Sequence, residues 1–159
     1  MSAVPRTGAW KRPAVYVLCV LGLGISGYLT AAHFTQGVVL ACPTVGVINC
    51  ERVTSSPQST VGPVPVPILG LVWFAVLAGL AAARGSGPAS TLRAAWALAG
   101  LAFVFYLVYA ELFLVGSICL WCTAVHVLVF VLCLIVLAGL DDGPDADTVD
   151  IDAEAARPG

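Results

Sequence analysis

Four long apolar stretches dominate this chain of 159 residues. A helix needs about 20 consecutive apolar residues to cross the roughly 30 Å hydrocarbon core of a bilayer, and each stretch reaches about that length. The stretches are Pro13–Phe34, Val64–Ala83, Ala94–Val115 and Ile118–Leu140. Because together they fill more than half of the sequence, the pattern predicts an all-α integral membrane protein built as a four-helix bundle.

Charged residues make up only 10% of the chain, and they are unevenly placed. Seven of the nine acidic residues lie within residues 141–159, a segment with little apolar surface to bury, so we expect it to be disordered. The formal net charge of −2 therefore comes from this tail. It gives no reason to expect binding to nucleic acid.

The basic residues predict the orientation, because short connections rich in Lys and Arg stay cytoplasmic. They gather before the first stretch and around the second connection, as Arg6, Lys11, Arg12, Arg84 and Arg93. We therefore expect a plasma-membrane protein with a cytoplasmic N-terminal segment (residues 1–12), a membrane domain (13–140) and a cytoplasmic tail (141–159). The connection over residues 35–63 is expected to face outward.

Six cysteines carry the chemistry that this sequence offers. Two, Cys19 and Cys133, lie inside apolar stretches and are expected to be packing residues, because a thiol in hydrocarbon forms little thiolate. The other four lie toward the outer face, a compartment that permits disulfides in most cells. They are Cys42 and Cys50 in the first outward connection, and Cys119 and Cys122 at the start of the fourth stretch.

Cys119 and Cys122 form a C-x-x-C motif where a helix is expected to begin. The partial positive charge and the unpaired N–H groups of a helix N-terminus stabilise a thiolate on Cys119. Two cysteines at this spacing can switch between dithiol and disulfide with little backbone motion. The motif therefore favours redox exchange.

Two other uses of the outer cysteines stay open. A zinc site would combine the C-x-x-C with Cys42 and Cys50, whose spacing is wider than zinc sites normally use, and with His33 as the nearest further ligand. A structural tetraspan protein would use the cysteines only as stapling disulfides. Covalent haem attachment is excluded, because Thr123 stands where that motif needs a histidine.

Two outward cysteine pairs beside a bilayer suggest an electron relay that works by thiol and disulfide exchange. The electrons must then leave to an acceptor of two electrons. The sequence carries no motif typical of flavin, nicotinamide or haem binding, and no metal cofactor is expected. The expected acceptor is therefore a quinone dissolved in the membrane.

The cysteines and their neighbours resemble the vitamin K epoxide reductase (VKOR) family. The matching features are the C-x7-C from Cys42 to Cys50, the E-R-V-T-S-S run directly after it, and the C-L-W-C from Cys119 to Cys122. The resemblance covers about residues 13–140, and the combination is more specific than either pair alone. The DsbB type of thiol oxidase resembles the chain less, because its C-x-x-C lies in the first outward loop.

This resemblance implies a role for each outer cysteine. Cys42 would exchange with substrate thiols, Cys50 would pass electrons to Cys119, and Cys122 would reduce the quinone, which is menaquinone, ubiquinone or phylloquinone. The implied partner is a DsbA-like thiol oxidase with a thioredoxin fold. We expect it to be a separate protein, since no such domain is fused here.

Ser56 matches the functional serine of the family, six residues after the second loop cysteine. Its hydroxyl is expected to hydrogen-bond a thiolate or a quinone oxygen, with capping of a short helix as an equal alternative. Animal members carry a tyrosine four residues after the last active cysteine, where this chain has His126, and an asparagine that residues 64–70 lack. The bacterial branch therefore resembles the chain better, and epoxide reduction is not expected.

Two polar residues inside the apolar stretches are further candidates for quinone binding or support. His126 lies one turn after Cys122 on the same helix face, where it can hydrogen-bond a quinone oxygen. Glu111, the only carboxylate inside a stretch, is expected to face the bundle interior and to hold a proton for quinol formation. Simple polar packing between helices is an equal alternative for both. Aromatic residues that line a quinone pocket or serve as packing are Trp73, Tyr106, Tyr109, Phe113 and Trp121.

Overall fold

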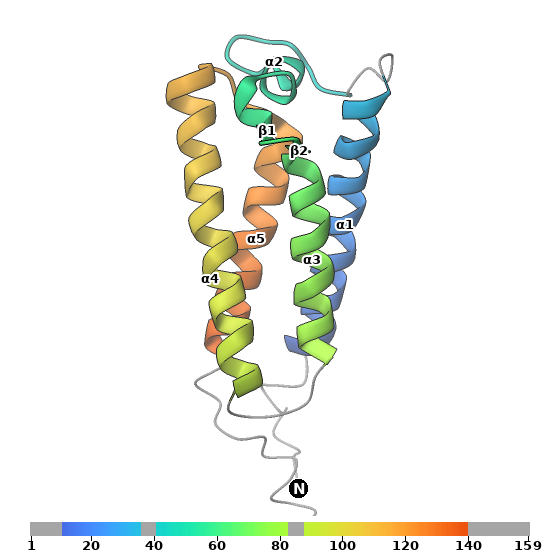
Figure 1. The fold of residues 1–159 in the computed structure, drawn as a ribbon, viewed down its shortest axis with the longest axis vertical. Coiled ribbons are helices and arrows are strands. Elements are labelled where there is room, and N and C mark those ends of the chain that lie inside the picture. The colour runs from blue at the N-terminus through green and yellow to red at the C-terminus, as the bar shows by residue number, and fades with distance from the viewer. Residues whose placement is uncertain (1–10, 36–40, 83–87, 140–159) are drawn as a thin grey trace, which may run out of the picture.

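The computed structural model describes residues 11–35, 41–82 and 88–139. Within these ranges, four long helices lie side by side as one bundle (Figure 1). They are α1 (Lys11–Phe34), α3 (Val66–Ala82), α4 (Pro88–Tyr109) and α5 (Leu120–Ala138). The π-helix η2 (Ala110–Val115) continues α4 without a break.

Residues 41–65 lie over one end of the bundle, and we call them the cap. The cap contains the short helix α2 (Cys50–Thr54), the 3₁₀ helix η1 (Pro57–Ser59) and the antiparallel hairpin of β1 (Thr60–Val61) and β2 (Val64–Pro65). Gly62 has a φ of +60°, the left-handed conformation that glycine adopts without cost, and it lets this hairpin turn within two residues.

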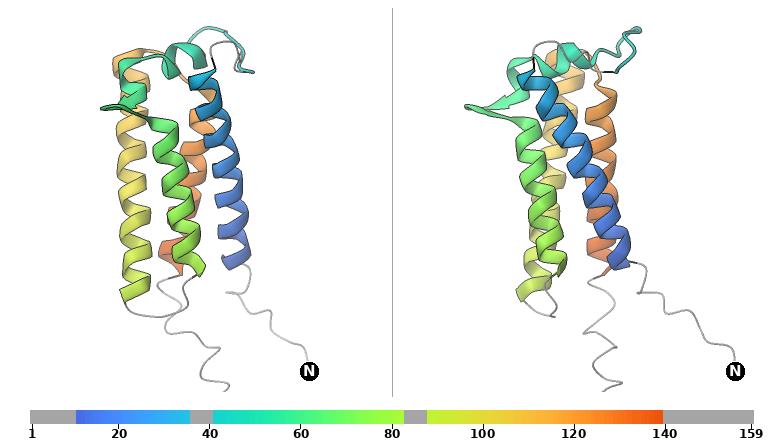
Figure 2. Two further views of the ribbon diagram at one scale, coloured as in Figure 1. Left: turned by 45° about the vertical axis from the view of Figure 1, so that its right-hand side comes forward. Right: turned by 90° about the vertical axis from the view of Figure 1, so that its right-hand side faces the viewer.

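The helices pack in a ring, seen from two further sides in Figure 2. Helix α1 contacts α3 and α5, while α4 contacts α5 and α3. At the end away from the cap, the Lys11 ammonium donates to the Ala138 carbonyl (3.1 Å) and the Arg12 guanidinium to the Ala81 carbonyl (3.4 Å). The first turn of α1 is therefore tied to the last turns of α5 and α3.

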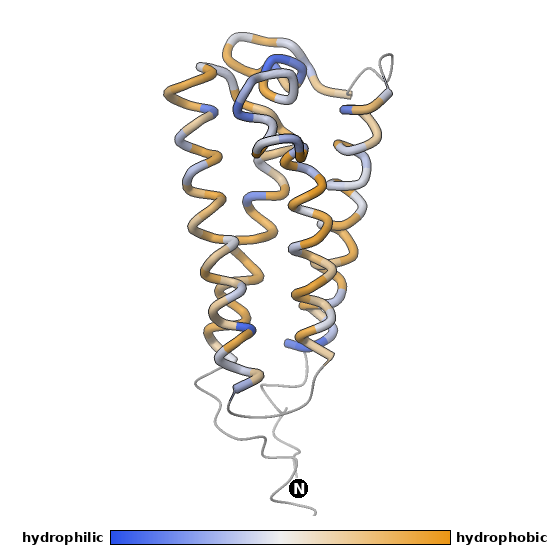
Figure 3. The backbone as a smooth tube through the Cα atoms, in the orientation of Figure 1, coloured by the Kyte–Doolittle hydropathy of each residue, from blue (hydrophilic) through white to orange (hydrophobic). Residues whose placement is uncertain are grey.

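The outer faces of the helices are apolar, as lipid contact requires. Figure 3 shows hydrophobic residues along the helices and hydrophilic ones mainly toward the two ends. Side chains such as Val20, Phe105 and Leu134 are exposed on these faces. Helices α1, α4 with η2, and α5 are long and apolar enough to cross a membrane. With 17 residues, α3 is shorter, about 25 Å by the rise of an α-helix. The prediction of an all-α membrane bundle is confirmed.

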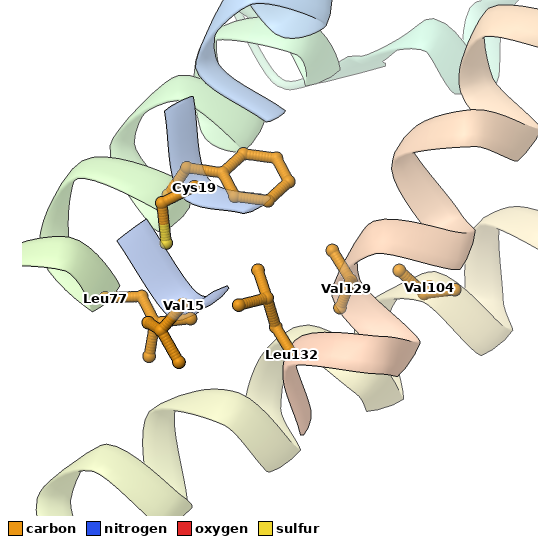
Figure 4. Close-up of a cluster of buried hydrophobic side chains, with 7 residues drawn as sticks. Val15, Cys19, Leu77, Val104, Val129 and Leu132 are labelled. Atoms are coloured by element: carbon orange, nitrogen blue, oxygen red, sulfur yellow. The ribbon is translucent and has the colours of Figure 1, made fainter. Parts of the chain in front are cut away.

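Apolar side chains from all four helices pack together in the bundle below the cap, and three of them, Phe74, Val104 and Val129, also line a cavity described below. Figure 4 shows this core, made of Val15, Cys19, Phe74, Leu77, Val104, Val129 and Leu132. Phe74, Leu77 and Leu132 have no exposed surface. Gly22 faces Phe74, and a Cβ at this position would overlap the phenyl ring. Glycine is therefore required for α1 and α3 to approach this closely.

Some helix boundaries differ from the sequence-based ones. Helix α4 begins at Pro88, six residues before the expected Ala94, because proline fits the first turn of a helix, where its missing N–H is not needed. Helix α3 begins at Val66, since the preceding residues 64–65 form a strand. The acidic tail and most of the N-terminal segment lie outside the described residues.

Candidate functional site

A short parallel ladder ties the cap to the start of α5. The N–H of Ile118 donates to the Val47 carbonyl (2.8 Å), and the N–H of Asn49 donates to the Ile118 carbonyl (3.0 Å). Asn49 directly precedes Cys50, and Ile118 directly precedes Cys119. The ladder therefore brings one cysteine of each pair to the same place.

A second tie holds the chain at Cys42. The Trp121 indole N–H donates to the Ala41 carbonyl (3.1 Å), and the Ala41 N–H donates to the Tyr28 hydroxyl (3.1 Å). The rings of Tyr28 and Trp121 meet edge to face with centroids 5.2 Å apart. Because Trp121 lies inside the C-x-x-C motif, the same residue spaces the inner cysteines and anchors the chain beside the outer ones.

The four outer cysteines belong to one packed cluster. Cys50 and Cys119 are fully buried in it, and Cys42 and Cys122 pack against it while keeping some exposed surface. Cys42 and Cys50 form a disulfide, whereas Cys119 and Cys122 are free thiols. We call Cys42/Cys50 the outer pair and Cys119/Cys122 the inner pair. The structure thus holds an oxidised pair against a reduced one.

Cys119 occupies the N-cap position of α5, as the C-x-x-C motif predicted. Its sulfur accepts a hydrogen bond from the Cys122 N–H at 3.2 Å. A hydrogen bond with the Cys122 thiol lowers the pKa of Cys119, while burial and the nearby Glu111 act in the opposite direction. The net effect favours the thiolate form of Cys119, the nucleophile in disulfide exchange.

A cavity of about 340 Å³ lies inside the bundle, between the helices and the cap. Its walls are mostly apolar and come from α1, α3, α4 and α5, with residues of α2 and η1 closing the cap side. Ligand pockets typically measure 300–1,000 Å³ and combine apolar walls with a few polar groups. The polar residues here are Ser26, His33, Thr54, Ser56, Gln58, Ser59, Glu111, Cys122 and His126.

The candidate residues from the sequence divide into two sets. Cys122, Ser56, Glu111 and His126 line the cavity, whereas the other three outer cysteines lie beside it in the cysteine cluster. Glu111 and His126 are more than nine-tenths buried. The structure therefore places the three supporting candidates in the wall of the same cavity as Cys122.

Ser56 stands at the N-cap position of η1, but its side chain makes no capping hydrogen bond. Its hydroxyl donates instead to the Val53 carbonyl at 2.7 Å. A hydroxyl that donates to protein still has lone pairs that accept a hydrogen bond. The side chain therefore does not cap η1, but its hydrogen bond satisfies a carbonyl in the last turn of the short helix α2.

Glu111 is held where α4 changes into the π-helix η2. Its backbone carbonyl accepts the N–H groups of Gly116 and Ser117, the latter at 3.1 Å. Gly116 has a φ of +65°, which glycine adopts without strain and which turns the chain toward Cys119. The Glu111 carboxylate lies beside Cys119, close to its backbone N–H. The only carboxylate in an apolar stretch thus lies beside the inner cysteine pair.

Of the five aromatic candidates, Trp73 alone lines the cavity. Tyr106, Tyr109 and Phe113 are exposed on the outer surface of the bundle, and Trp121 holds the cap. The sequence reasoning missed Trp96, which also lines the cavity and pairs with Trp73. Each indole N–H of this pair donates to the backbone carbonyl of the other tryptophan, at 3.1 and 3.2 Å.

Ser26 and Gln58 are further cavity residues that the sequence did not single out. Ser26 is buried against Gly70, where a Cβ would come within 2.8 Å of the serine hydroxyl oxygen. The only signal in the sequence was a serine among the glycines of the first apolar stretch. That signal is equally typical of close helix packing.

The remaining cysteines and the zinc hypothesis can be judged from the described residues. Cys19 and Cys133 are buried among apolar side chains, away from the cysteine cluster. Within the part of the chain that the structure describes, no group of three or more His, Cys, Asp or Glu side chains is arranged to hold a metal ion. The disulfide also removes Cys42 and Cys50 as thiolate ligands.

Comparison with known proteins identifies the family. The profile of the vitamin K epoxide reductase family matches residues 13–137, most of the chain. No curated protein matches significantly. Enzymes of this family are membrane oxidoreductases that act on thiols and quinones. The matched range covers nearly all of the four long helices, together with the cap and the cysteine cluster, and the chain belongs to the vitamin K epoxide reductase family.

Proposed function

We propose that this protein is a thiol:quinone oxidoreductase that reoxidises a separate DsbA-like partner and so supports disulfide formation in exported proteins. The observation that carries the proposal is the cysteine cluster. It holds an oxidised outer pair against a reduced inner pair, and one cysteine of the inner pair lines an apolar cavity. This arrangement is what a relay from protein thiols to a lipid-soluble acceptor needs.

The exposure of the four cysteines supports one order of electron flow. Cys42 keeps exposed surface, so a thiolate of the partner attacks it, forms a mixed disulfide and releases Cys50. The second thiol of the partner then displaces Cys42, so that the partner leaves as a disulfide and both outer cysteines become thiols. Cys50 then attacks Cys119 of the oxidised inner pair, which lies beside it in the buried cluster. The Cys42 thiol then attacks Cys50 and resolves the Cys50–Cys119 disulfide. The outer disulfide re-forms, and two electrons remain on Cys119 and Cys122.

The cavity supports a quinone as the substrate that accepts these electrons. Its size and apolar walls suit a flat ring, and Cys122 stands at its edge as the electron donor. Ser56, His126 and Glu111 are the polar groups that we propose for the quinone oxygens and their protons. Menaquinone, ubiquinone and phylloquinone share this ring chemistry and are all candidates.

The charges support the proposed orientation. Lys11 and Arg12 lie at the end of the bundle away from the cap, and positive charge marks the cytoplasmic side. We therefore propose that the cap and the outer cysteines face the extracytoplasmic side of the plasma membrane. In this arrangement residues 1–12 and 141–159 are cytoplasmic segments flanking the membrane domain.

The proposal is tested by following quinone absorbance with the purified protein in detergent. A reduced thioredoxin-fold dithiol protein supplies the electrons, and menaquinone, ubiquinone and phylloquinone analogues are tried in turn. We expect quinone loss with the wild type and none with Cys122→Ala. Cysteines that only staple the structure would give no quinone loss with any of these acceptors, and that result would refute the proposal.

A further inference from the structure

The two thiols of the inner pair differ in their access to the cavity. Cys122 lines it, whereas Cys119 has no exposed surface and does not reach it. When a quinone oxidises the pair, dithiol and quinone become disulfide and quinol. Two electrons pass to the quinone, and each thiol gives up one proton. Cys122 lies beside Cys119 and lines the cavity but has its own proton to release, so the proton of Cys119 calls for a second group that lies beside this residue and lines the cavity.

Glu111 is placed to be that second group. Its carboxylate lies beside Cys119, close to the backbone N–H of that residue, and the same side chain lines the cavity. Among the described residues the other carboxylate is Glu51, which is exposed in α2 and does not line the cavity. His126 also lines the cavity, but it lies two helical turns beyond Cys119, about 10 Å along the axis.

The backbone around Glu111 fixes this position. The residue lies in the π-helix η2, and its carbonyl accepts the N–H groups of both Gly116 and Ser117. A π-helical turn is rare and often marks a functional site, because it rotates the side chains that follow it relative to a regular helix. The chain that returns from Gly116 brings Cys119 back to the carboxylate.

We propose that Glu111 carries the Cys119 proton to a quinone oxygen, a step that rests on the proposed function. Cys119 loses its proton to the carboxylate and attacks the Cys122 sulfur, while Cys122 passes two electrons to the quinone. A disulfide forms between the two cysteines. The protonated Glu111 delivers the Cys119 proton to one quinone oxygen, the Cys122 proton goes to the other, and quinol leaves. Glu111 returns to its carboxylate form.

The step is tested in a single turnover with protein whose inner pair has been reduced beforehand. The reduced protein is mixed with quinone without oxygen, and quinol formation is followed by absorbance. Glu111→Gln keeps the size of the side chain and one oxygen beside Cys119 but removes the acid. Loss of a general acid–base group typically costs about 10²- to 10⁴-fold, so we expect quinol formation to slow by at least about 100-fold.

Three controls separate proton transfer from a structural role. Glu51→Gln removes the exposed carboxylate and is expected to leave the rate unchanged. Glu111→Asp keeps the acid and is expected to restore part of the rate, and formate is expected to accelerate Glu111→Ala. The oxidation of one equivalent of partner thiols by the outer disulfide is expected to proceed at the wild-type rate in Glu111→Gln.

A purely electrostatic role predicts a different result. The negative charge of Glu111 raises the pKa of Cys119, so its removal alone would speed the reaction or leave it unchanged. A wild-type rate of quinol formation in Glu111→Gln therefore overturns the proton transfer and leaves the proposed function standing. Equal slowing of the partner step would also overturn it, by revealing a structural defect. A wild type that reduces no quinone overturns the proposed function and this step together.

Discussion

Cysteines lie in two different surroundings in this bundle, one below the cavity and one beneath the cap. Away from the cap, Cys19 packs among valine, leucine and phenylalanine side chains (Figure 4), of which Phe74, Val104 and Val129 also line the cavity. The half toward the cap encloses a cavity and gathers four cysteines at its edge. We therefore expect a cysteine in this fold to be inert where its neighbours are hydrocarbon, and redox-active where its neighbour is another thiol beside a helix N-terminus.

The largest effect expected from this comparison is on quinone reduction. Cys119→Ala should abolish it, because the inner pair can no longer form a disulfide, whereas Cys19→Ala and Cys133→Ala should keep nearly the full rate. The measurement is steady-state quinone loss with a reduced partner. A Cys19→Ala protein that folds but does not reduce quinone would contradict the difference between the two groups of cysteines.

A substitution in the apolar core should lower the stability of the protein without changing quinone reduction. Leu132→Ala removes a fully buried side chain from the apolar core and is expected to lower the free energy of unfolding by about 2–5 kcal/mol. Leu132 does not line the cavity, so quinone reduction per folded molecule should stay unchanged. Denaturant unfolding in detergent, combined with the activity of the folded fraction, checks both parts. An unchanged free energy of unfolding would argue against close packing around Leu132.

The reactivity of Cys119 sharpens the account of the cap half. The Cys122 hydrogen bond lowers the Cys119 pKa, so its loss should raise the pKa and reduce the thiolate fraction at pH 7. Cys122→Ala should therefore slow alkylation of Cys119 by up to about tenfold relative to Cys122→Ser, which keeps a donor. The difference should vanish at a pH above both pKa values. Mass spectrometry of the Cys119 peptide gives the rates, and equal rates at pH 7 would contradict this role of Cys122.

The smallest expected effect concerns Ser56. Ser56→Ala removes a hydroxyl that we propose to hydrogen-bond the quinone. The loss should cost about 1 kcal/mol of binding free energy, or roughly a fivefold rise in KM for quinone. Ser55→Ala is the matched control, because Ser55 is exposed and its hydroxyl donates to the Glu51 carbonyl. Steady-state kinetics with varied quinone give both values. An equal KM in the two variants would remove Ser56 from the quinone site.

The sequence predicted those features that depend on local patterns. Length and hydropathy indicated the membrane helices, and the C-x-x-C spacing indicated Cys119 at a helix N-terminus. The Trp73–Trp96 pair, Ser26 and Gln58 were not found, because their place in the cavity depends on how distant helices pack. The π-helix around Glu111 carries no local sequence signal either. It arises where the chain must leave α4, turn at Gly116 and return to the cap.

The relay between the two pairs is the central claim, and trapping its intermediate tests it most directly. In a Cys42→Ser, Cys122→Ser double variant, Cys50 and Cys119 lose their usual partners but remain together in the buried cluster. After mild oxidation, peptide mapping by mass spectrometry should find a Cys50–Cys119 disulfide in most molecules. Free thiols at both positions, or a disulfide to Cys19 or Cys133 instead, would contradict the relay.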